Sequence, residues 1–489
     1  LVCPHEAIRM KPYAEKELSG APQGFMSLPW KGKELSDHRM TIQVAPDDCT
    51  GCGVCVDVCP AKSKEVAKHK AINMEPKLEH LDREQAAFDF FLNIPELDRT
   101  LLPHDTVKGS QVLEPLFEFS GACAGCGETP YLKLMSQLFG DRAIIGNATG
   151  CSSIYGGNLP TTPWSTNAAG RGPTWNNSLF EDTAEFGLGM RLAADQTREY
   201  AEVLLRGLAS QVGGDLTDGI LSATFDDEQA FAEQRQRVGE LRQALEKLAT
   251  PEAKRLAEIA DAFIKRSVWI VGGDGWAYDI GYGGLDHAFT TGRDVNILVL
   301  DTGVYSNTGG QASKSTPRAA IAKFAAAGKP SRRKDLGMMA VAYGNVYVGQ
   351  IAMGANPAQT IKTFKEAESY RGPSLILAYS HCIAQGIDMT TAMTHQKDAT
   401  NSGFWPLYRY DPRNARSGEH AFRLDSRKPK MRFEQFAMME GRFAMLARSN
   451  PEQAKKLFAL AQKDIDDQWH YYEQMAGVER DVSSGDANH

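Results

Sequence analysis

The stretch that decides the fold is Val268-Trp269-Ile270-Val271-Gly272-Gly273-Asp274-Gly275, in which an apolar run passes directly into a glycine-rich turn. Such a run is typical of a buried strand, and the glycines mark a turn before a helix. Similar short apolar runs recur at 142–146, 296–300, 338–342 and 374–378, with helical patterns between several of them, as at 357–370. Strands that alternate with helices predict an α/β fold with a doubly wound, mostly parallel sheet.

The composition is that of a globular protein. Of 489 residues, 42% are hydrophobic and 24% are charged, which allows a core of useful size. At ~150 residues per domain, the length suggests roughly three domains. The net charge of −7 disfavours a broad nucleic-acid-binding face. No stretch approaches the ~20 uninterrupted apolar residues of a membrane span, so we expect neither nucleic acid nor membrane as a partner.

A first group of cysteines has a specific spacing. Cys49-x2-Cys52-x2-Cys55-x3-Cys59-Pro60 is the bacterial ferredoxin run that binds a [4Fe–4S] cluster. In two-cluster ferredoxins the fourth cysteine of each run serves the other cluster. Cys3-Pro4 resembles the end of an earlier run, so Cys3 can complete the cluster of the first three cysteines. Cys59 is then predicted to serve a second cluster, whose other ligands are absent here. A structural zinc site is the alternative, because four thiolates also suit zinc.

The remaining cysteines are Cys123, Cys126, Cys151 and Cys382. A lone C-x2-C leaves zinc, redox and iron–sulfur interpretations open, and a single cysteine is more often a small buried hydrophobe. What distinguishes these four cysteines is their position relative to the predicted strands and helices. Cys151 and Cys382 follow predicted strands, and the C-x2-C pair precedes the helix that leads into the first strand. Because ligands bind at the carboxyl ends of parallel strands, the four thiols could converge there on a [4Fe–4S] cluster.

Two turns rich in oxygen ligands follow neighbouring predicted strands. Asp274 lies in the first turn, and Thr302 and Val304 lie in the second, one helix and one strand further on. An ordinary βα loop is the alternative for either turn alone. Together, the Asp274 carboxylate, the Thr302 hydroxyl and the Val304 carbonyl can bind Mg²⁺, which prefers oxygen ligands and retains phosphates. Gly273 and Gly275 let the backbone approach a diphosphate at a helix N-terminus. A diphosphate bound without a P-loop lysine indicates thiamine diphosphate rather than ATP.

These patterns divide the chain into four segments. Residues 1–78 are predicted to form a partial two-cluster ferredoxin-like α+β domain, and residues 79–118 a connecting segment. Residues 119–430 are predicted to form the thiamine diphosphate and Mg²⁺ domain, with a charged helical insertion at 190–265. Residues 431–489 read as a C-terminal helical tail.

The chain resembles pyruvate:ferredoxin (flavodoxin) oxidoreductases, in their C-terminal part and over essentially all 489 residues. The motifs that carry the resemblance are GACAGCGETPY at 121–131, NATGCSSIYGGNLPTTPW at 147–164, GDGWAYDIGYGGLDH at 273–287, DTGVYSNTGGQASK at 301–314 and YSHCI at 379–383. These motifs are long and distinctive, so the resemblance does not depend on any single short pattern.

The resemblance implies a role for each candidate residue. The cluster nearest the thiamine would be held by Cys123, Cys126, Cys151 and Cys382. A relay cluster would be held by Cys3, Cys49, Cys52 and Cys55. Mg²⁺ would be held by Asp274, Thr302 and the Val304 carbonyl. Asn307 would contact the substrate beside the thiazolium.

The resemblance also implies an activity. Pyruvate would be oxidatively decarboxylated with coenzyme A to acetyl-CoA and CO2. The cofactor acts as the electron sink, and the clusters would pass electrons singly to ferredoxin or flavodoxin. The family's N-terminal domains, absent from this chain, carry the glutamate that activates the aminopyrimidine, the residues that grip the 2-oxoacid and most coenzyme A contacts. We therefore do not expect full activity from this chain alone. The family is usually homodimeric, and metal-type cysteine spacing without a signal peptide favours the cytoplasm.

Other interpretations remain open. A related enzyme acting on 2-oxoglutarate, indolepyruvate or oxalate is the nearest alternative. A stand-alone ferredoxin-type carrier is disfavoured by Asp274, Thr302 and Asn307, and a decarboxylase without redox function is disfavoured by the four thiols at 123–382. We expect His381 to be structural. We also expect the basic residues at 329–334 to form a solvated loop rather than a docking site for an acidic ferredoxin.

Overall fold

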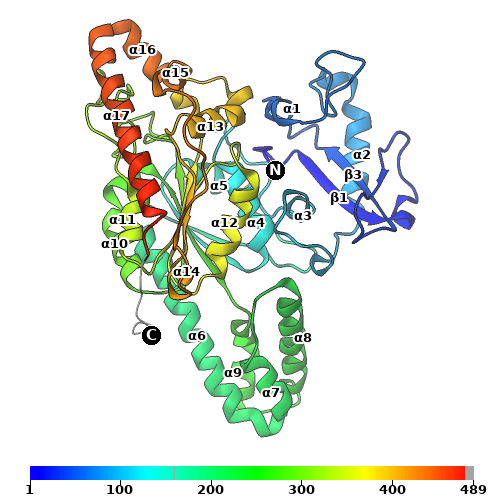
Figure 1. Ribbon diagram of the computed structural model, residues 1–489. Helices are drawn as coiled ribbons and strands as arrows, with labels where there is room; N and C mark the ends of the chain where they lie inside the picture. Colours follow the sequence, from blue (N-terminus) through cyan, green and yellow to red (C-terminus); the bar gives the residue numbers. More distant parts are fainter. Residues whose placement is uncertain (159, 480–489) are drawn as a thin grey trace.

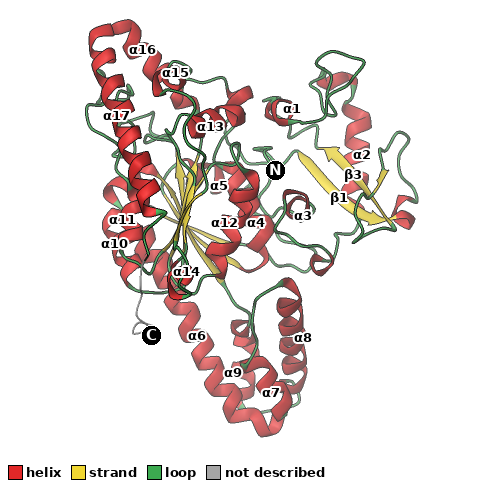
Figure 2. Cartoon of the chain, in the orientation of Figure 1, coloured by secondary structure: helices red, strands yellow, loops and turns green. Residues whose placement is uncertain are grey.

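An eight-stranded sheet forms the centre of the computed structural model, which describes residues 1–158 and 160–479 (Figures 1 and 2). The strand order is β11-β10-β8-β9-β7-β6-β4-β5. The strands are β4 (Ala143–Ala148), β5 (Thr174–Ser178), β6 (Ser267–Gly273), β7 (Asn296–Asp301), β8 (Tyr347–Ile351), β9 (Ser374–Tyr379), β10 (Tyr408–Tyr410) and β11 (Phe422–Leu424). Neighbours from β8 to β5 are parallel, whereas β10 pairs antiparallel with both β8 and β11. The predicted doubly wound, mostly parallel sheet is confirmed.

Helices cover both faces of this sheet (Figure 2). One face packs against α4 (Thr129–Phe139), α5 (Cys151–Gly156) and α12 (Pro357–Ser369). The other face packs against α10 (Tyr282–Thr290), α11 (Leu336–Ala342), α16 (Gly441–Ser449) and α17 (Pro451–Met475). Side chains alternate between the two cores as a strand requires, with Trp269 and Val271 on the first face and Val268 and Ile270 on the second. Burial on both faces explains why these strands read as continuous apolar runs.

One predicted strand is wrong. The apolar run at 338–342 lies in helix α11, and the strand follows at Tyr347–Ile351. The helix begins where the Asp335 carboxylate accepts a hydrogen bond from the Met338 N–H, and Gly344 follows it in the left-handed region at φ +79°. A short apolar run does not distinguish a buried helix from a buried strand, and here the capping aspartate and the glycine decide.

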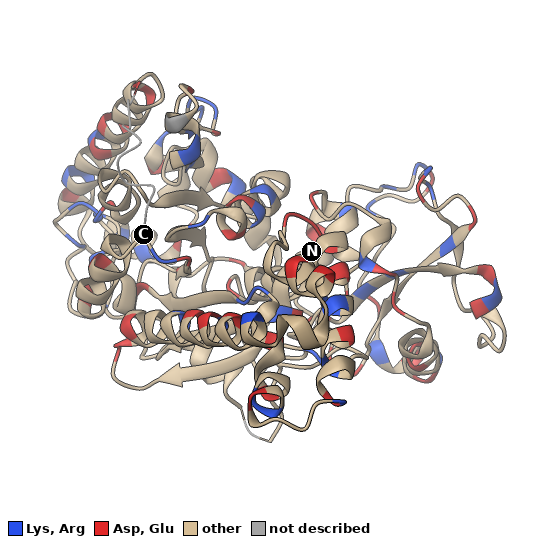
Figure 3. Ribbon diagram, turned by 90° about the horizontal axis from the view of Figure 1, so that it is seen from below, with Lys and Arg blue, Asp and Glu red and all other residues tan. Residues whose placement is uncertain are grey.

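A helical arm projects from the sheet (Figure 1, lower part). It consists of α6 (Thr183–Val212), α7 (Gly214–Leu221), α8 (Glu228–Leu245) and α9 (Pro251–Ile259). The arm has an apolar core of its own, which includes Leu205, Phe231, Leu241 and Leu256. Basic and acidic residues are interspersed along its helices (Figure 3).

The N-terminal segment forms a small antiparallel sheet beside the main body (Figure 1). Its strands are β1 (Ile8–Ala14), β2 (Leu28–Pro29) and β3 (His38–Val44), in the order β1-β3-β2. Helix α2 (Leu81–Asn93) packs on this sheet through Phe88 and Phe91. The short helix α1 (Val54–Val58) instead contacts α13 (Ala392–Asn401) of the main body.

The remaining elements are short. They are the helices α3 (Val107–Gln111), α14 (Pro412–Arg416) and α15 (Phe433–Ala437), and the helical turns η1 (Glu15–Leu18), η2 (Lys77–Glu79), η3 (Arg99–Leu101), η4 (Gly140–Arg142), η5 (Ala260–Phe263), η6 (Gly275–Ile280), η7 (Ile383–Gln385) and η8 (Met389–Thr391). Within residues 1–158 and 160–479, no helix is both long enough and apolar enough to cross a bilayer.

Candidate functional site

Four parallel strands deliver the predicted site residues to one edge of the main sheet. Strands β4, β6, β7 and β9 end just before the segments that carry Cys151, Asp274, Thr302 and Cys382. The strand ends are in register, since Gly273 pairs with Leu300 and Asp301 pairs with Tyr379. This carboxyl edge is where open α/β sheets bind ligands.

Three oxygen atoms meet where β6 and β7 end. The Thr302 hydroxyl donates to Asp274 Oδ2 at 2.7 Å and lies 3.1 Å from the Val304 carbonyl oxygen. The backbone N–H groups of Thr302 and Gly303 also donate to the Asp274 carboxylate, at 2.9 and 3.0 Å. Gly303 has φ +76°, a conformation that favours glycine and sharpens the turn between the two residues. A carboxylate, a hydroxyl and a carbonyl are the hard donors that Mg²⁺ prefers, so this oxygen triad (Asp274, Thr302, Val304) fits the predicted ion.

A second carboxylate lies behind the triad. Asp301 is 1% exposed and accepts a hydrogen bond from the Tyr278 hydroxyl at 2.5 Å. Arg333 contacts both the Asp301 carboxylate and the Tyr278 hydroxyl. Burial, followed by the nearby charge of Asp301, raises the pKa of Asp274 well above its usual range. Arg333 balances one of these two buried charges, and a divalent cation at the triad would balance the other.

The two predicted diphosphate glycines lie in different surroundings. A Cβ at Gly275 would lie 2.0 Å from the Tyr305 ring, so this glycine has a packing role of its own. A Cβ at Gly273 would meet only the Leu300 carbonyl oxygen, at 3.8 Å. The backbone at Gly273 is therefore the more open of the two to a ligand. The helix predicted after this turn begins as a π-helical turn, η6, before α10.

The inner thiol set (Cys123, Cys126, Cys151, Cys382) also lies at this edge. The pKa of Cys151 is raised to about 12, first by burial and then by Glu128, with smaller contributions from Cys382 and Cys123. The pKa of Cys382 is likewise raised to about 12, by burial and by Glu128 and Cys123. The pKa of Cys151 is thus affected by Cys382, and the pKa of each of these two cysteines is affected by Cys123. Bound iron would stabilise their thiolate forms against this cost, because metal binding displaces the thiol protons.

A buried histidine joins the segments that carry these thiols. The His381 Nε2–H donates to the Gly125 carbonyl at 2.8 Å, and Gln396 donates to His381 Nδ1 at 3.0 Å. Burial lowers the pKa of His381 to about 4, which keeps the ring neutral. A Cβ at Gly127 would lie 2.4 Å from the His381 carbonyl oxygen, so the two segments are in close contact. These contacts agree with the expected structural role of His381.

The loop after β7 connects the oxygen triad to the inner thiol set. Ser306 Oγ lies 3.2 Å from Cys151 Sγ, two residues beyond Val304. Asn307 follows Ser306 and is exposed. The predicted substrate-contacting residue is therefore accessible and lies next to a residue that touches a predicted cluster ligand.

The outer thiol set lines a separate cavity of about 490 Å³, which is bordered by Cys3, Cys49, Cys52 and Cys55. The pKa of Cys55 is raised to about 11 by burial, with contributions from Cys3 and Cys52. Gly51 and Gly53 have φ values of +71° and +77°, so the loop curls in a conformation that favours glycine. Cys59 does not border this cavity, as expected if it serves a different cluster.

A hydrogen bond joins the segments that carry Cys3 of the outer thiol set and Cys123 of the inner thiol set. His5, two residues after Cys3, bonds through Nε2 to the carbonyl of Ala122 at 2.9 Å, next to Cys123. The His5 carbonyl in turn accepts from the Phe119 N–H at 3.1 Å. The segment with the outer thiols is thereby fixed against the loop that begins the inner set.

Both thiol sets fit cubane clusters in their chemistry. Each supplies four cysteines that form no disulfide, the number that a [4Fe–4S] cluster requires. In the part of the chain that the structure describes, no three His, Cys, Asp or Glu residues lie close enough together to hold a single metal ion.

Several residues at this edge lie inside the quoted motifs but were assigned no role from the sequence. Glu128 is buried, accepts a hydrogen bond from Tyr155 at 2.8 Å, and has a pKa raised to about 7 by burial. Ser306 and Tyr278 are likewise identified by their contacts alone. The Tyr278 hydroxyl donates a hydrogen bond to the Asp301 carboxylate.

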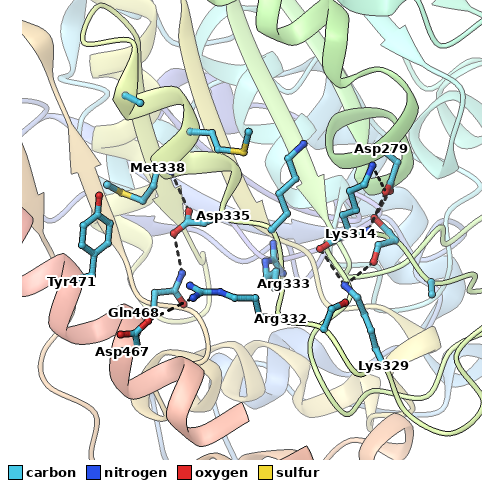
Figure 4. Close-up of a pocket in the computed structure, with 16 residues that line it drawn as sticks. Asp279, Lys314, Lys329, Arg332, Arg333, Asp335, Met338, Asp467, Gln468 and Tyr471 are labelled. Carbon is cyan, nitrogen blue, oxygen red and sulfur yellow. Dashed lines mark hydrogen bonds and ion pairs between the residues drawn. The ribbon is translucent and has the colours of Figure 1, made fainter. Parts of the chain in front are cut away.

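The expectation of a solvated loop at 329–334 is wrong for two of its residues. Lys329 is buried and donates to three backbone carbonyls, and Arg333 holds Asp301. Arg332 is half exposed beside Asp467, at 3.5 Å. Figure 4 shows these side chains around a cavity of about 990 Å³, which Met338 and Tyr471 also line.

Comparison with known proteins identifies what this site resembles. Residues 1–63 match the 4Fe-4S dicluster domain, and residues 253–378 match the thiamine pyrophosphate enzyme C-terminal TPP binding domain. A putative pyruvate-flavodoxin oxidoreductase from Synechocystis sp. is 59% identical over 97% of this chain and 40% of that protein. This chain is similar to one part of the longer pyruvate-flavodoxin oxidoreductases. The predicted resemblance and the iron–sulfur and thiamine diphosphate cofactors are confirmed.

Other pyruvate-flavodoxin oxidoreductase relatives extend the similarity. A probable pyruvate-flavodoxin oxidoreductase from Escherichia coli is 50% identical over 97% of this chain and 40% of that protein. The pyruvate:ferredoxin oxidoreductase of Moorella thermoacetica is 49% identical over 97% of this chain and 41% of that protein. The chain therefore spans about two fifths of the length of the curated relatives that it matches.

Proposed function

We propose that this chain is the part of a pyruvate:ferredoxin or pyruvate-flavodoxin oxidoreductase that binds the diphosphate of its cofactor and conducts electrons outward. The whole protein would convert pyruvate and coenzyme A to acetyl-CoA and CO2, with release of two electrons. The observation that carries this proposal is the proximity of the oxygen triad and the inner thiol set, with Ser306 of the triad's loop 3.2 Å from Cys151. The activities for which its relatives are named support it.

The oxygen triad would anchor the cofactor. Asp274, Thr302 and the Val304 carbonyl would bind Mg²⁺, and the open backbone at Gly273 would accommodate the diphosphate. Thiamine diphosphate, when bound, supplies the electron sink for decarboxylation of a 2-oxoacid. Asn307 would bind the substrate at the exposed end of the same loop.

The thiols would carry the electrons away. The inner thiol set would hold the cluster nearest the cofactor, and the outer thiol set would hold the next cluster, fixed in place through His5 and Ala122. Iron–sulfur clusters transfer one electron at a time, so two clusters in series suit an oxidation that releases two electrons. Cys59 would ligate a third cluster, completed by residues outside this chain.

The rest of the protein would complete the assembly. We propose that it supplies the glutamate for the aminopyrimidine, the grip on pyruvate and most contacts to coenzyme A, and that the whole protein is a cytoplasmic homodimer. Ferredoxin or flavodoxin would accept the electrons.

The first test is the content of iron, acid-labile sulfide and zinc in the anaerobically prepared chain. We expect about eight irons with matching sulfide per chain, because two sets of four cysteines each hold one [4Fe–4S] cluster. About four irons would contradict the proposal that this chain assembles both clusters by itself. Zinc without sulfide would contradict electron transfer altogether.

A further inference from the structure

A side-chain hydroxyl faces one thiol of the inner set. Ser306 Oγ lies 3.2 Å from Cys151 Sγ, and both residues are half-buried. Ser306 lies on the loop after β7, and Cys151 is the first residue of α5, after β4. The contact therefore joins two segments that are 155 residues apart in sequence.

Other thiols of this set receive a different kind of hydrogen bond. Cys126 Sγ accepts from the Glu128 N–H at 3.4 Å, and Cys382 Sγ accepts from the Ala384 N–H at 3.5 Å. Both of these donors belong to the backbone, so a change of side chain to any residue other than proline leaves them in place. The Ser306 hydroxyl can be removed by a single change.

The direction of the Ser306 contact follows from the chemistry of the thiol. Between a free thiol and a hydroxyl, either group can donate. A cysteine that ligates iron is a thiolate and has no proton to give. With a cluster present, the Ser306 hydroxyl must therefore donate to the sulfur of Cys151.

Such a hydrogen bond changes how easily the cluster is reduced. A reduced cluster carries one more negative charge than an oxidised one, and part of that charge resides on the ligating sulfurs. A hydrogen-bond donor that points at such a sulfur stabilises the reduced form of the cluster more than the oxidised form, and this raises the reduction potential of the cluster.

Resting on the proposed function, we infer that Ser306 hydrogen-bonds the iron-bound Cys151 and raises the reduction potential of the cluster nearest the thiamine diphosphate. Ser306 is thus a positioning residue that makes this cluster a better electron acceptor. Because the same loop carries Val304 and Asn307, the cofactor site and its electron acceptor share one structural segment.

The test is an anaerobic redox titration of the whole chain, followed by the electron paramagnetic resonance of the reduced clusters. In Ser306→Ala we expect one of the two cluster couples to shift to a more negative potential. The expected change is about tenfold in the reduction equilibrium, which is about 59 mV for a one-electron couple. The couple of the outer thiol set should stay in place and serves as an internal control.

Two further variants separate hydrogen bonding from packing. Ser306→Thr keeps the hydroxyl and should restore the potential to near that of the unchanged chain. Thr308→Ala removes a hydroxyl from the same loop, one that donates to Gln311 Oε1 at 2.6 Å, and should move neither couple. Equal potentials in Ser306→Ala and the unchanged chain, or equal shifts in Ser306→Ala and Ser306→Thr, would overturn the inference.

Iron and sulfide content distinguishes this failure from that of the proposed function. Full clusters with no shift in Ser306→Ala would overturn only the role of Ser306. An unchanged chain without a cluster at the inner thiol set would overturn the proposed function and this inference together.

Discussion

At the residue scale, the least expected interaction is that of Arg333 with Asp301. Asp301 directly precedes Thr302 and is buried beside Asp274, so two carboxylates share a buried site. Arg333 contacts Asp301, and its guanidinium lies 4.6 Å from the centre of the Trp405 ring. Its neighbour Arg332 instead forms an exposed pair with Asp467. The two adjacent arginines therefore have different roles.

We predict that Arg333→Met lowers the free energy of unfolding by about 2 to 3 kcal/mol. This is near the lower end for a broken buried ion pair, because the Arg333 side chain retains 21% exposure. Urea unfolding followed by circular dichroism measures the change. Arg332→Met is the matched control and should change the free energy by less than ~0.5 kcal/mol. Equal effects of the two substitutions would show that the Asp301 contact is unimportant.

A second prediction at this scale concerns Asp274. Asp274→Asn removes the one charged ligand of the oxygen triad, so Mg²⁺-dependent binding of thiamine diphosphate should weaken at least tenfold, which is about 1.4 kcal/mol. Isothermal titration calorimetry with and without Mg²⁺ measures this. Asp286→Asn, on the next helix, is the control, since Asp286 pairs with the Tyr343 hydroxyl outside the triad. Unchanged affinity in Asp274→Asn would rule out Asp274 as a ligand.

At the element scale, a small group of charges joins helix α8 of the arm to the body. Glu228, the first residue of α8, accepts from Arg99 Nε at 2.8 Å and from Arg142 Nη2 at 3.1 Å. Arg142 also lies 4.0 Å from the centre of the Phe231 ring in the arm. Burial alone would raise the pKa of Glu228, but Arg142 and Arg99 outweigh it and hold the pKa at about 2.

This low pKa predicts a pH-dependent contribution to stability. A carboxyl with a folded pKa of about 2 and an ordinary value of 4.5 contributes about 3 kcal/mol above pH 4.5, and loses it as the pH falls toward 2. Glu228→Gln should therefore have a lower free energy of unfolding than the unchanged chain at pH 7. The difference between the two proteins should become smaller as the pH falls from 4.5 to 2. Denaturant unfolding at several pH values measures the gap.

The control for this prediction is Glu258→Gln, because Glu258 is an exposed partner of Arg255 in the same arm. This substitution should cause little difference at any of these pH values. A gap for Glu228→Gln that stays constant with pH would contradict the assigned pKa.

At the scale of the whole molecule, the packing of the N-terminal segment sets the relation between the two thiol sets. His5 bonds to Ala122, and Thr394 donates to Asp57 at 2.7 Å, so the segment is attached on both sides of the outer thiol set. Glu6 and Lys133 form a fully buried pair at 2.7 Å in the same contact. These contacts fix the outer thiol set relative to the inner thiol set.

We predict that the two thiol sets assemble clusters independently. Cys123→Ser/Cys126→Ser and Cys52→Ser/Cys55→Ser should each reduce iron from about eight to about four per chain, because each pair belongs to a different cubane. Cys59→Ser is the control and should leave the iron content unchanged. Iron and sulfide analysis of the anaerobic proteins measures this, and loss of all iron in either double variant would show that the sets are not independent.

The sheet and four of its eight strands, β4, β6, β7 and β9, could be predicted from the sequence because these four are largely buried and read as apolar runs. The apolar run at 338–342 was wrongly predicted as a strand by the same reasoning, because it forms helix α11. The antiparallel strands β10 and β11, at one end of the sheet, are three residues each and leave too little pattern to recognise. A short apolar run shows neither the helical nor the strand periodicity, so capping and packing determine which of the two it forms.

The candidate ligands were accessible from sequence because cofactors demand particular side chains at particular spacings. The ferredoxin run that begins at Cys49 and the aspartate after a strand are local patterns, which can be recognised without knowledge of the fold, whereas the inner thiol set was assigned through the family resemblance. The residues that contact those ligands could not be predicted in this way. Ser306 meets Cys151, Arg333 meets Asp301, and His5 meets Ala122 across long separations in sequence. Such contacts depend on where strands and loops come together in space, so folding alone establishes which hydroxyl faces a sulfur and which arginine balances a buried carboxylate.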